Sequence, residues 1–332
     1  MQSLARVLVL IGLILGLVTP LRGESNYSVL NLGRISPPTL QAESMRSDAL
    51  HGRPLYQVAT GDLWISGENH LWRWNLASSA VTRFELPAKL HRPIKLAAFD
   101  GGEILGFDRE RLWTLDYQSK TWRSLDIGLE AGCPTLPATF ARAAKPLLQF
   151  LLGKCGGYLV DLKGKTPRVF SFAQALVDDV FSMAGGEDKA GEFVLFTQNR
   201  AIFRQHLNNG KAALEKVYSS KSDLKGIVGG DGVFYAWTGK AILVFDRNMR
   251  RQKVIPVVGQ RRLAAFGVTP EFHALVFDDG TLELMGIKSK KKWYSLQPLK
   301  FAQYVDFIDD GKYLMVSAET GQPQVFRVTI AD

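Results

Sequence analysis

Side chains that could carry catalysis are thinly spread along this chain. The five histidines form no close pair and no His-x-His motif: His51, His70, His91, His206 and His273. A Gly-x-Ser-x-Gly nucleophile motif and a phosphate-binding glycine loop are also missing from the sequence. Glycine pairs at 101–102, 156–157, 185–186 and 229–230 indicate turns. We therefore expect no catalytic residues, no cofactor and no metal, and we favour a protein that is not an enzyme.

The two cysteines are the next reactive groups. Cys133 and Cys155 are expected to lie close together on one face of the fold derived below, which favours a disulfide in an oxidising compartment. The bond would close about two dozen residues and contribute about 3 kcal/mol to the free energy of unfolding. Two buried free thiols are the alternative. A catalytic cysteine is disfavoured because no histidine lies in the same part of the chain.

The first 23 residues predict a secretory signal peptide. Arg6 precedes an apolar run at 7–18, which Pro20 ends, and this run is too short to span a bilayer. An uncleaved anchor is the alternative. We expect the mature chain to contain no transmembrane span and to be secreted or periplasmic, in a bacterial envelope. Removal of the signal peptide would take away Arg6 and Arg22. The mature chain would then contain 39 Lys and Arg residues and 32 Asp and Glu residues, which gives a net charge of +7.

Internal repetition dominates the remaining chain. Segments 61–87 and 101–127 each contain an apolar strand, a polar turn, a second strand that begins with an aromatic residue, a polar loop and a third strand. Similar segments follow at 146–162, which is the divergent copy, and at 192–205, 232–246, 272–286 and 312–328. Each lies 40 to 46 residues after the previous one. Four-stranded units of this length are typical of β-propeller blades. The sequence predicts an all-β fold, a seven-bladed β-propeller of four-stranded antiparallel blades, as one domain over 24–332. Six or eight blades are the alternatives, because the third unit is irregular.

One more apolar strand precedes each unit and should line the central channel. These strands are expected at 56–60, 94–99, 139–144, 179–184, 225–229, 263–268 and 302–308. Their small and apolar residues offer no carboxylate or histidine for chemistry at the axis. After Phe301 only three strands fit before the chain ends. The strand expected at 27–33 should therefore complete the last blade and remove an open sheet edge.

The first unit carries the clearest motif. Its sequence, Gly-Asp-Leu-Trp-Ile-Ser followed by Leu-Trp-Arg-Trp-Asn over 61–75, resembles the regulator-propeller repeats of bacterial sensor proteins. The resemblance is partial over 101–126 and loose elsewhere, and it implies architecture only. The tryptophans lie at equivalent strand positions and are expected to pack between blades rather than stack on sugars: Trp64, Trp72, Trp74, Trp113, Trp122, Trp237 and Trp293.

Strand order places two sets of polar residues on opposite faces of such a disc. Turns between second and third strands share one face with the connections between blades, including two long loops expected at 34–55 and 127–138. We predict this face to be the binding face, with Glu68, Asn69, His70, His91, Arg92, Asp108, Arg109, Glu110, Asn199, Arg200, Lys240, Asp278 and Asp279. Ordinary solvated turns are the alternative.

The opposite face carries turns between third and fourth strands, and these turns are basic. The candidate basic face comprises Arg247, Arg250, Arg251, Lys288, Lys290, Lys291 and Lys292. It suits an anionic surface or an acidic protein, although lysines in outer turns also keep sheet edges soluble. Nucleic acid is disfavoured, because no stacking aromatics interleave with these residues.

These observations favour a non-catalytic binding or scaffold propeller that contacts a protein or an anionic envelope component. We expect a monomer unless it is in a complex. A propeller hydrolase or lyase acting on a sugar or lactone is one alternative, and it requires acidic or histidine side chains converging near the axis. A small-ligand sensor module is the other, and it requires a central polar pocket.

Overall fold

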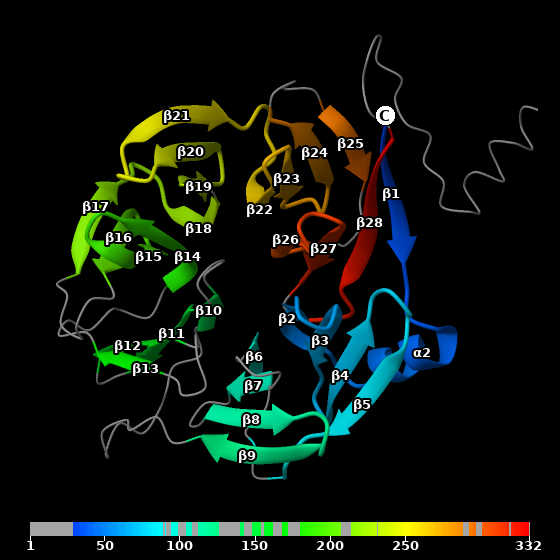
Figure 1. Ribbon diagram of the computed structural model, residues 1–332. Helices are drawn as coiled ribbons and strands as arrows, with labels where there is room; N and C mark the ends of the chain where they lie inside the picture. The colour runs from blue at the N-terminus through cyan, green and yellow to red at the C-terminus, as the bar shows by residue number, and fades with distance from the viewer. Residues whose placement is uncertain are drawn as a thin grey trace, which may run out of the picture.

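The strands of this protein gather into a ring of small sheets. The computed structural model describes residues 29–88, 90, 94–98, 104–107, 112–125, 140–142, 148–153, 156–161, 168–171, 180–206, 214–230, 232–287, 292–296, 301–318 and 320–331. Within these residues the strands form seven four-stranded antiparallel sheets. Figure 1 shows the sheets arranged around a ring, with one edge strand of each sheet innermost. The predicted all-β architecture of four-stranded antiparallel units is confirmed.

Each sheet is numbered here in chain order from its inner strand outward. Sheet 1 consists of β2 (His51–Gln57), β3 (Asp62–Ser66), β4 (His70–Asn75) and β5 (Val81–Glu85). Sheet 2 consists of β6 (Lys95–Ala98), β7 (Ile104–Phe107), β8 (Leu112–Asp116) and β9 (Thr121–Leu125). Sheet 3 consists of β10 (Phe140–Arg142), β11 (Leu148–Gly153), β12 (Gly156–Asp161) and β13 (Arg168–Ser171). Sheet 4 consists of β14 (Val180–Asp188), β15 (Gly191–Gln198), β16 (Ala201–His206) and β17 (Glu215–Ser219). Sheet 5 consists of β18 (Leu224–Gly230), β19 (Val233–Thr238), β20 (Ala241–Asp246) and β21 (Arg251–Pro256). Sheet 6 consists of β22 (Leu263–Val268), β23 (Phe272–Phe277), β24 (Leu282–Gly286) and β25 (Lys292–Leu296).

Sheet 7 joins the two ends of the described chain. Its strands β26 (Tyr304–Ile308), β27 (Tyr313–Ser317) and β28 (Gln324–Ala331) come from the end of the sequence, and β1 (Val29–Ile35) is its outermost strand. β1 pairs with β28 along its whole length, from Val29 opposite Ala331 to Ile35 opposite Val325. The predicted closure by an N-terminal strand is therefore confirmed, and it gives β28 a partner on both sides.

Apolar side chains from neighbouring sheets hold the ring together. One cluster joins Trp64 and Phe84 of sheet 1 to Trp113 and Leu115 of sheet 2. Another joins Phe193 of sheet 4 to Phe234 and Phe245 of sheet 5, and equivalent clusters join sheets 5 to 6 and 6 to 7. The described tryptophans follow the prediction: Trp64, Trp72, Trp74, Trp113 and Trp237 are buried and Trp122 is half-buried.

The segment predicted as a long loop at 34–55 is largely regular structure. β1 extends to Ile35, α2 (Thr39–Ser47) follows Pro38, and β2 begins at His51. Ala42 and Met45, one turn apart on α2, are buried, and Met45 packs with the core of sheets 1 and 7. The loop prediction was wrong, because two spaced apolar residues among polar ones anchor a short helix without a long amphipathic pattern.

Two further expectations about the inner strands need correction. The inner strand of sheet 1 is His51–Gln57 rather than 56–60, and Val58 lies in the following turn. The glycine pairs 185–186 and 229–230 lie inside β14 and β18 rather than in turns. A Cβ at Gly186 would approach the Phe234 ring to 2.7 Å, and one at Gly229 would approach it to 2.5 Å. These glycines therefore make room for an aromatic ring between sheets 4 and 5.

Candidate binding surfaces

Antiparallel strand order sorts the turns onto two faces. The connector face is defined here by two sets of residues. The first set is the turns 67–69, 199–200, 239–240 and 278–281 with residues 318 and 320–323, and the second is the described parts of the links between sheets, 36–50, 220–223, 257–262 and 301–303. The name basic face is used from here on for the whole opposite face, on which the candidate basic residues were predicted. It carries the turns 58–61, 76–80, 189–190, 247–250 and 309–312. Hydrogen bonds tie turns to links: Ser220 N donates to Arg200 O at 2.7 Å, and Val257 N donates to Lys240 O at 2.8 Å.

His70, a predicted binding residue, lies within a network built on Asp48. The buried Asp48 carboxylate accepts from Trp72 Nε1 at 2.7 Å and from the Asn69 amide at 2.9 Å. His70 Nδ1 is 3.1 Å from Asp48 Oδ2, but its angle does not make it a hydrogen bond, and His70 Nε2 is 3.3 Å from Glu85 Oε1. This network fastens the first turn of the connector face to the link from sheet 7.

Lys240 has a similar fastening role. Its ammonium group donates at 3.0–3.3 Å to three successive backbone carbonyl oxygens, those of Gly259, Gln260 and Arg261. Arg261 in turn pairs with the buried Glu283 at 2.6 Å and lies 4.1 Å from the centroid of the Phe277 ring. The link between sheets 5 and 6 is consequently held in one shape by side chains beneath it.

The remaining predicted residues of this face are mostly exposed. Glu68, Asn69 and Asn199 are exposed, and Arg200 pairs with Asp223 at 2.9 Å in full contact with water. Asp278 accepts from the Arg262 amide, and a hydrogen bond from the Thr281 amide keeps the pKa of Asp279 below its ordinary value. Outside the described residues lie His91, Arg92, Asp108, Arg109 and Glu110, as do Cys133 and Cys155 with their predicted disulfide.

Exposed large apolar side chains lie on three separate links of the connector face. Among the described residues, those with the largest exposed fractions are Val258 (84%), Leu40 (75%), Val58 (74%), Phe301 (68%) and Val254 (43%). Leu40 lies on the link between sheets 7 and 1, Val258 on the link between sheets 5 and 6, and Phe301 on the link between sheets 6 and 7. Val58 lies on the basic face, and Val254 lies on an outer strand. The links therefore combine fixed backbone with exposed apolar surface.

On the basic face, the predicted residues Arg247, Arg250 and Arg251 are all exposed around the turn between β20 and β21. Arg251 Nη1 donates to the Tyr218 hydroxyl of sheet 4 at 3.2 Å. Lys288, Lys290 and Lys291 lie outside the described residues, and the side chain of Lys292 does too, although its backbone begins β25.

An ion pair between two inner strands escaped the sequence reasoning. Arg53 of β2 and Asp306 of β26 form a bidentate pair, with Arg53 Nε donating to Asp306 Oδ2 at 3.0 Å. Burial acts to lower the pKa of Arg53, but the Asp306 charge outweighs it and the pKa is raised. The expectation that inner strands carry no carboxylate was wrong, since Asp306 lies within the inner strand expected at 302–308. The displaced start of β2 brings Arg53 beside it, and the two neutralise one another.

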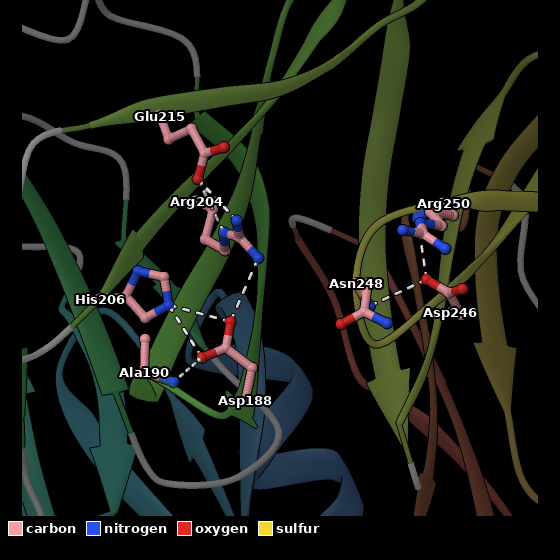
Figure 2. Close-up of polar contacts among 8 residues, drawn as sticks. All are labelled: Asp188, Ala190, Arg204, His206, Glu215, Asp246, Asn248 and Arg250. Atoms are coloured by element: carbon pink, nitrogen blue, oxygen red, sulfur yellow. Dashed lines mark hydrogen bonds and ion pairs between the residues drawn. The ribbon is translucent and has the colours of Figure 1, made fainter.

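A second polar cluster missed by sequence reasoning lies on the basic-face side of sheet 4. Figure 2 shows His206 Nε2 against both oxygens of Asp188, and Arg204 between Asp188 and Glu215. Burial acts to raise the pKa of Asp188, but hydrogen bonds from His206 and the Ala190 amide and the Arg204 charge hold it below its ordinary value. The charged groups of this cluster therefore pair with one another, and they hold β16 beside the turn between β14 and β15.

The arginine of the first repeat motif has a comparable structural role. Arg73 pairs with the fully buried Asp62 at 2.7 Å and lies over the rings of Trp64 and Tyr117. Arg204 likewise lies over the Phe193 ring. In both pairs the aspartate lies beside the turn between the first and second strands, and the arginine lies in the third strand of the same sheet. This combination is the sequence signal that could have revealed both pairs.

Within the described ranges, no helix is both long and apolar enough to cross a bilayer. No group of three or more His, Cys, Asp or Glu side chains in those ranges is arranged as a metal-binding cluster.

Comparison with known proteins bears on the fold. No protein-family model and no curated protein matches this sequence. Among solved structures, the chain is similar to one in the structure titled "Crystal Structure of Mitotic Checkpoint Complex", with 11% identity, a TM-score of 0.65, and coverage of 94% of this chain and 96% of that chain. At this identity the similarity concerns architecture alone. Taken with the ring of four-stranded sheets, it identifies the fold as a β-propeller.

Proposed function

We propose that this protein is a non-catalytic binding scaffold, a seven-bladed propeller whose connector face docks another protein of the bacterial envelope. The observation that carries the proposal is that strongly exposed apolar side chains lie on separate links of that face, Leu40 at 75% and Val258 at 84%. Apolar side chains exposed among polar ones supply the apolar contacts of protein-protein interfaces. The repeat motif over 61–75 suits a propeller of the regulator type.

Rigidity of the links supports the same proposal. Asp48 accepts hydrogen bonds from the Asn69 amide and the Trp72 side chain, and Lys240 donates to three carbonyl groups of a link. A loop that is already held in its bound shape loses little conformational entropy when a partner docks. The connector face therefore offers preorganised contacts, as a scaffold requires.

The test compares substitutions on the two faces. The protein is used as bait in an envelope extract, the co-purifying protein is identified by mass spectrometry and purified, and its affinity is measured by calorimetry. Val258→Glu and Leu40→Glu should each weaken binding at least tenfold. Val58→Glu is the matched control, since Val58 has a similar exposed fraction on the opposite face, and it should change affinity less than twofold. Equal effects of all three would reject the connector face as the docking surface.

Export is part of this proposal and has its own test. A signal at 1–23 would place the chain in an oxidising compartment, where Cys133 and Cys155 could pair. Mass spectrometry of the protein recovered from the envelope should give a mature N-terminus near residue 24 and no free thiol before reduction. Recovery with residues 1–23 attached, or with both thiols alkylated without reduction, would contradict these two points separately.

A further inference from the structure

The turn between β20 and β21 is unusually well fixed for a surface turn. Asp246 Oδ1 accepts from the amides of Asn248 and Arg250, each at 2.9 Å, and Oδ2 accepts from Gln252 Nε2 at 2.8 Å. Figure 2 shows Asp246 inside this turn, next to the polar cluster of sheet 4. Met249 has a φ of +63°, yet its side chain is buried in the core between sheets 4 and 5. The turn thus holds a non-glycine residue in a strained conformation.

The cations on this turn are without carboxylate partners. Arg247, Arg250, Arg251 and Lys253 are exposed, and among the described residues no carboxylate lies within ion-pair distance of any of them. The nearest acidic residue in sequence, Asp246, is occupied by amide donors. Elsewhere, arginines beside carboxylates pair with them, as Arg73 does with Asp62 and Arg261 with Glu283. Four positive charges within seven residues are therefore exposed to solvent without a neutralising carboxylate.

Their residue types and positions indicate what they could bind. Three of the four are arginines, whose planar guanidinium groups bind carboxylates through two parallel hydrogen bonds. An extra residue in β21, Gln252, places Arg251 opposite Phe245 and Lys253 opposite Val244. Since Phe245 and Val244 are adjacent on β20, their side chains point to opposite sides of the sheet, and so do Arg251 and Lys253. Arg251, which contacts Tyr218 of sheet 4, and Lys253 therefore do not share the flat plane that a membrane surface would need.

We propose that the turn 246–250 and the start of β21 form a preformed site for an extended acidic segment of another protein. This site is separate from the connector face and would let the scaffold hold two partners at once. Asp246 acts as a positioning residue, because it fixes the turn that presents the arginines. The outer edge of β21 does not offer strand pairing, since Pro256 lacks an N–H and the extra residue at Gln252 interrupts the ladder. Side chains therefore do the binding.

The probe is a fluorescein-labelled peptide of ten glutamates. Its binding to the full chain is followed by anisotropy at about 50 mM and about 200 mM salt, between which the screening length falls from above to below about 10 Å. The variant Arg247→Gln/Arg250→Gln/Arg251→Gln should bind at least tenfold more weakly. The control Arg34→Gln/Arg46→Gln/Arg327→Gln removes three exposed arginines elsewhere and should bind within twofold of the parent.

Asp246→Ala separates positioning from net charge. It removes a negative charge, so attraction by charge alone predicts tighter binding, whereas loss of the fixed turn predicts binding at least threefold weaker. Equal loss in both triple variants, tighter binding by Asp246→Ala, or binding of phosphatidylglycerol vesicles in place of the peptide would overturn the proposal. Val258→Glu should leave peptide binding unchanged, so failure at this site is distinguishable from failure of the connector face.

Discussion

His273 is a buried titratable side chain that the binding proposals do not use. It lies on β23 among the rings of Tyr235 and Phe266, with Nε2 unpartnered. Burial lowers its pKa from 6.5 to about 4, and the charge of Lys253 acts in the same direction. The unfolded chain therefore takes up a proton first as pH falls below 6.5, and stability is lost between pH 6.5 and 4.

We predict that the free energy of unfolding falls by about 2 kcal/mol from this group between pH 7.5 and pH 5. His273→Leu should remove that component, because leucine does not titrate. Urea unfolding of both proteins at the two pH values measures the difference. An identical loss of stability in the variant would show that other groups account for the acid sensitivity.

Asp48 gives a second prediction at this scale. Asp48→Ala leaves the Trp72 indole N–H and the Asn69 amide without their acceptor in a part-buried site, and should destabilise the protein by about 3 kcal/mol. Glu85 flanks the same His70 from the other side but is largely exposed, so Glu85→Ala should cost less than about 0.5 kcal/mol. Thermal unfolding followed by circular dichroism compares the two. Similar costs would mean that Asp48 does not organise the network.

Among elements, β1 carries the closure of the ring. Leu32 on β1 packs with Leu314, Val316 and Phe326 of sheet 7, so Leu32→Ala should cost about 2–4 kcal/mol. Arg34→Ala, an exposed change on the same strand, should fall within about 0.5 kcal/mol. Denaturant midpoints provide the measurement. A tolerated Leu32→Ala would indicate that the last sheet is stable without its N-terminal strand.

The elements also show why parts of the fold could be predicted and others not. The apolar second strands recur at nearly constant spacing and have aromatic residues at fixed places, so the sheets and the closing strand could be predicted from pattern alone. The helix α2 and the true start of β2 could not, since the few apolar residues there, such as Met45 and Leu50, give no periodicity. Their burial depends on contacts with sheets 1 and 7 that are remote in sequence.

The candidate residues show a similar division. Strand order is enough to predict that Asn69, Asn199 and Lys240 lie on one face, because antiparallel topology alone decides on which side a turn lies. Sequence could not show that Lys240 faces three carbonyl groups or that Asp48 lies beneath His70, as both depend on how a link folds over a turn. The exposure of apolar residues such as Val258 could not be predicted, since the residue type alone does not show whether a valine is buried or exposed.

At the scale of the whole molecule, the two faces predict two independent modes of binding. The connector face presents Leu40 and Val258 on fixed links, and its contacts should be insensitive to salt. The turn at 246–250 presents unpaired arginines, and its contacts should weaken as salt rises. Titrating the purified partner and the acidic peptide over a range of salt concentrations separates the two modes. Parallel salt dependence of both ligands would indicate one shared surface.

Hydrogen exchange of the protein with and without its co-purified partner tests the central claim most directly, because it reports on every part of the disc at once. The scaffold account predicts slower exchange in the links 36–50, 220–223 and 257–262, with the turns 58–61, 189–190 and 309–312 unchanged. Protection confined to the inner strands around Arg53 and Asp306, or to the opposite turns alone, would contradict docking on the connector face and would favour a ligand held at the axis.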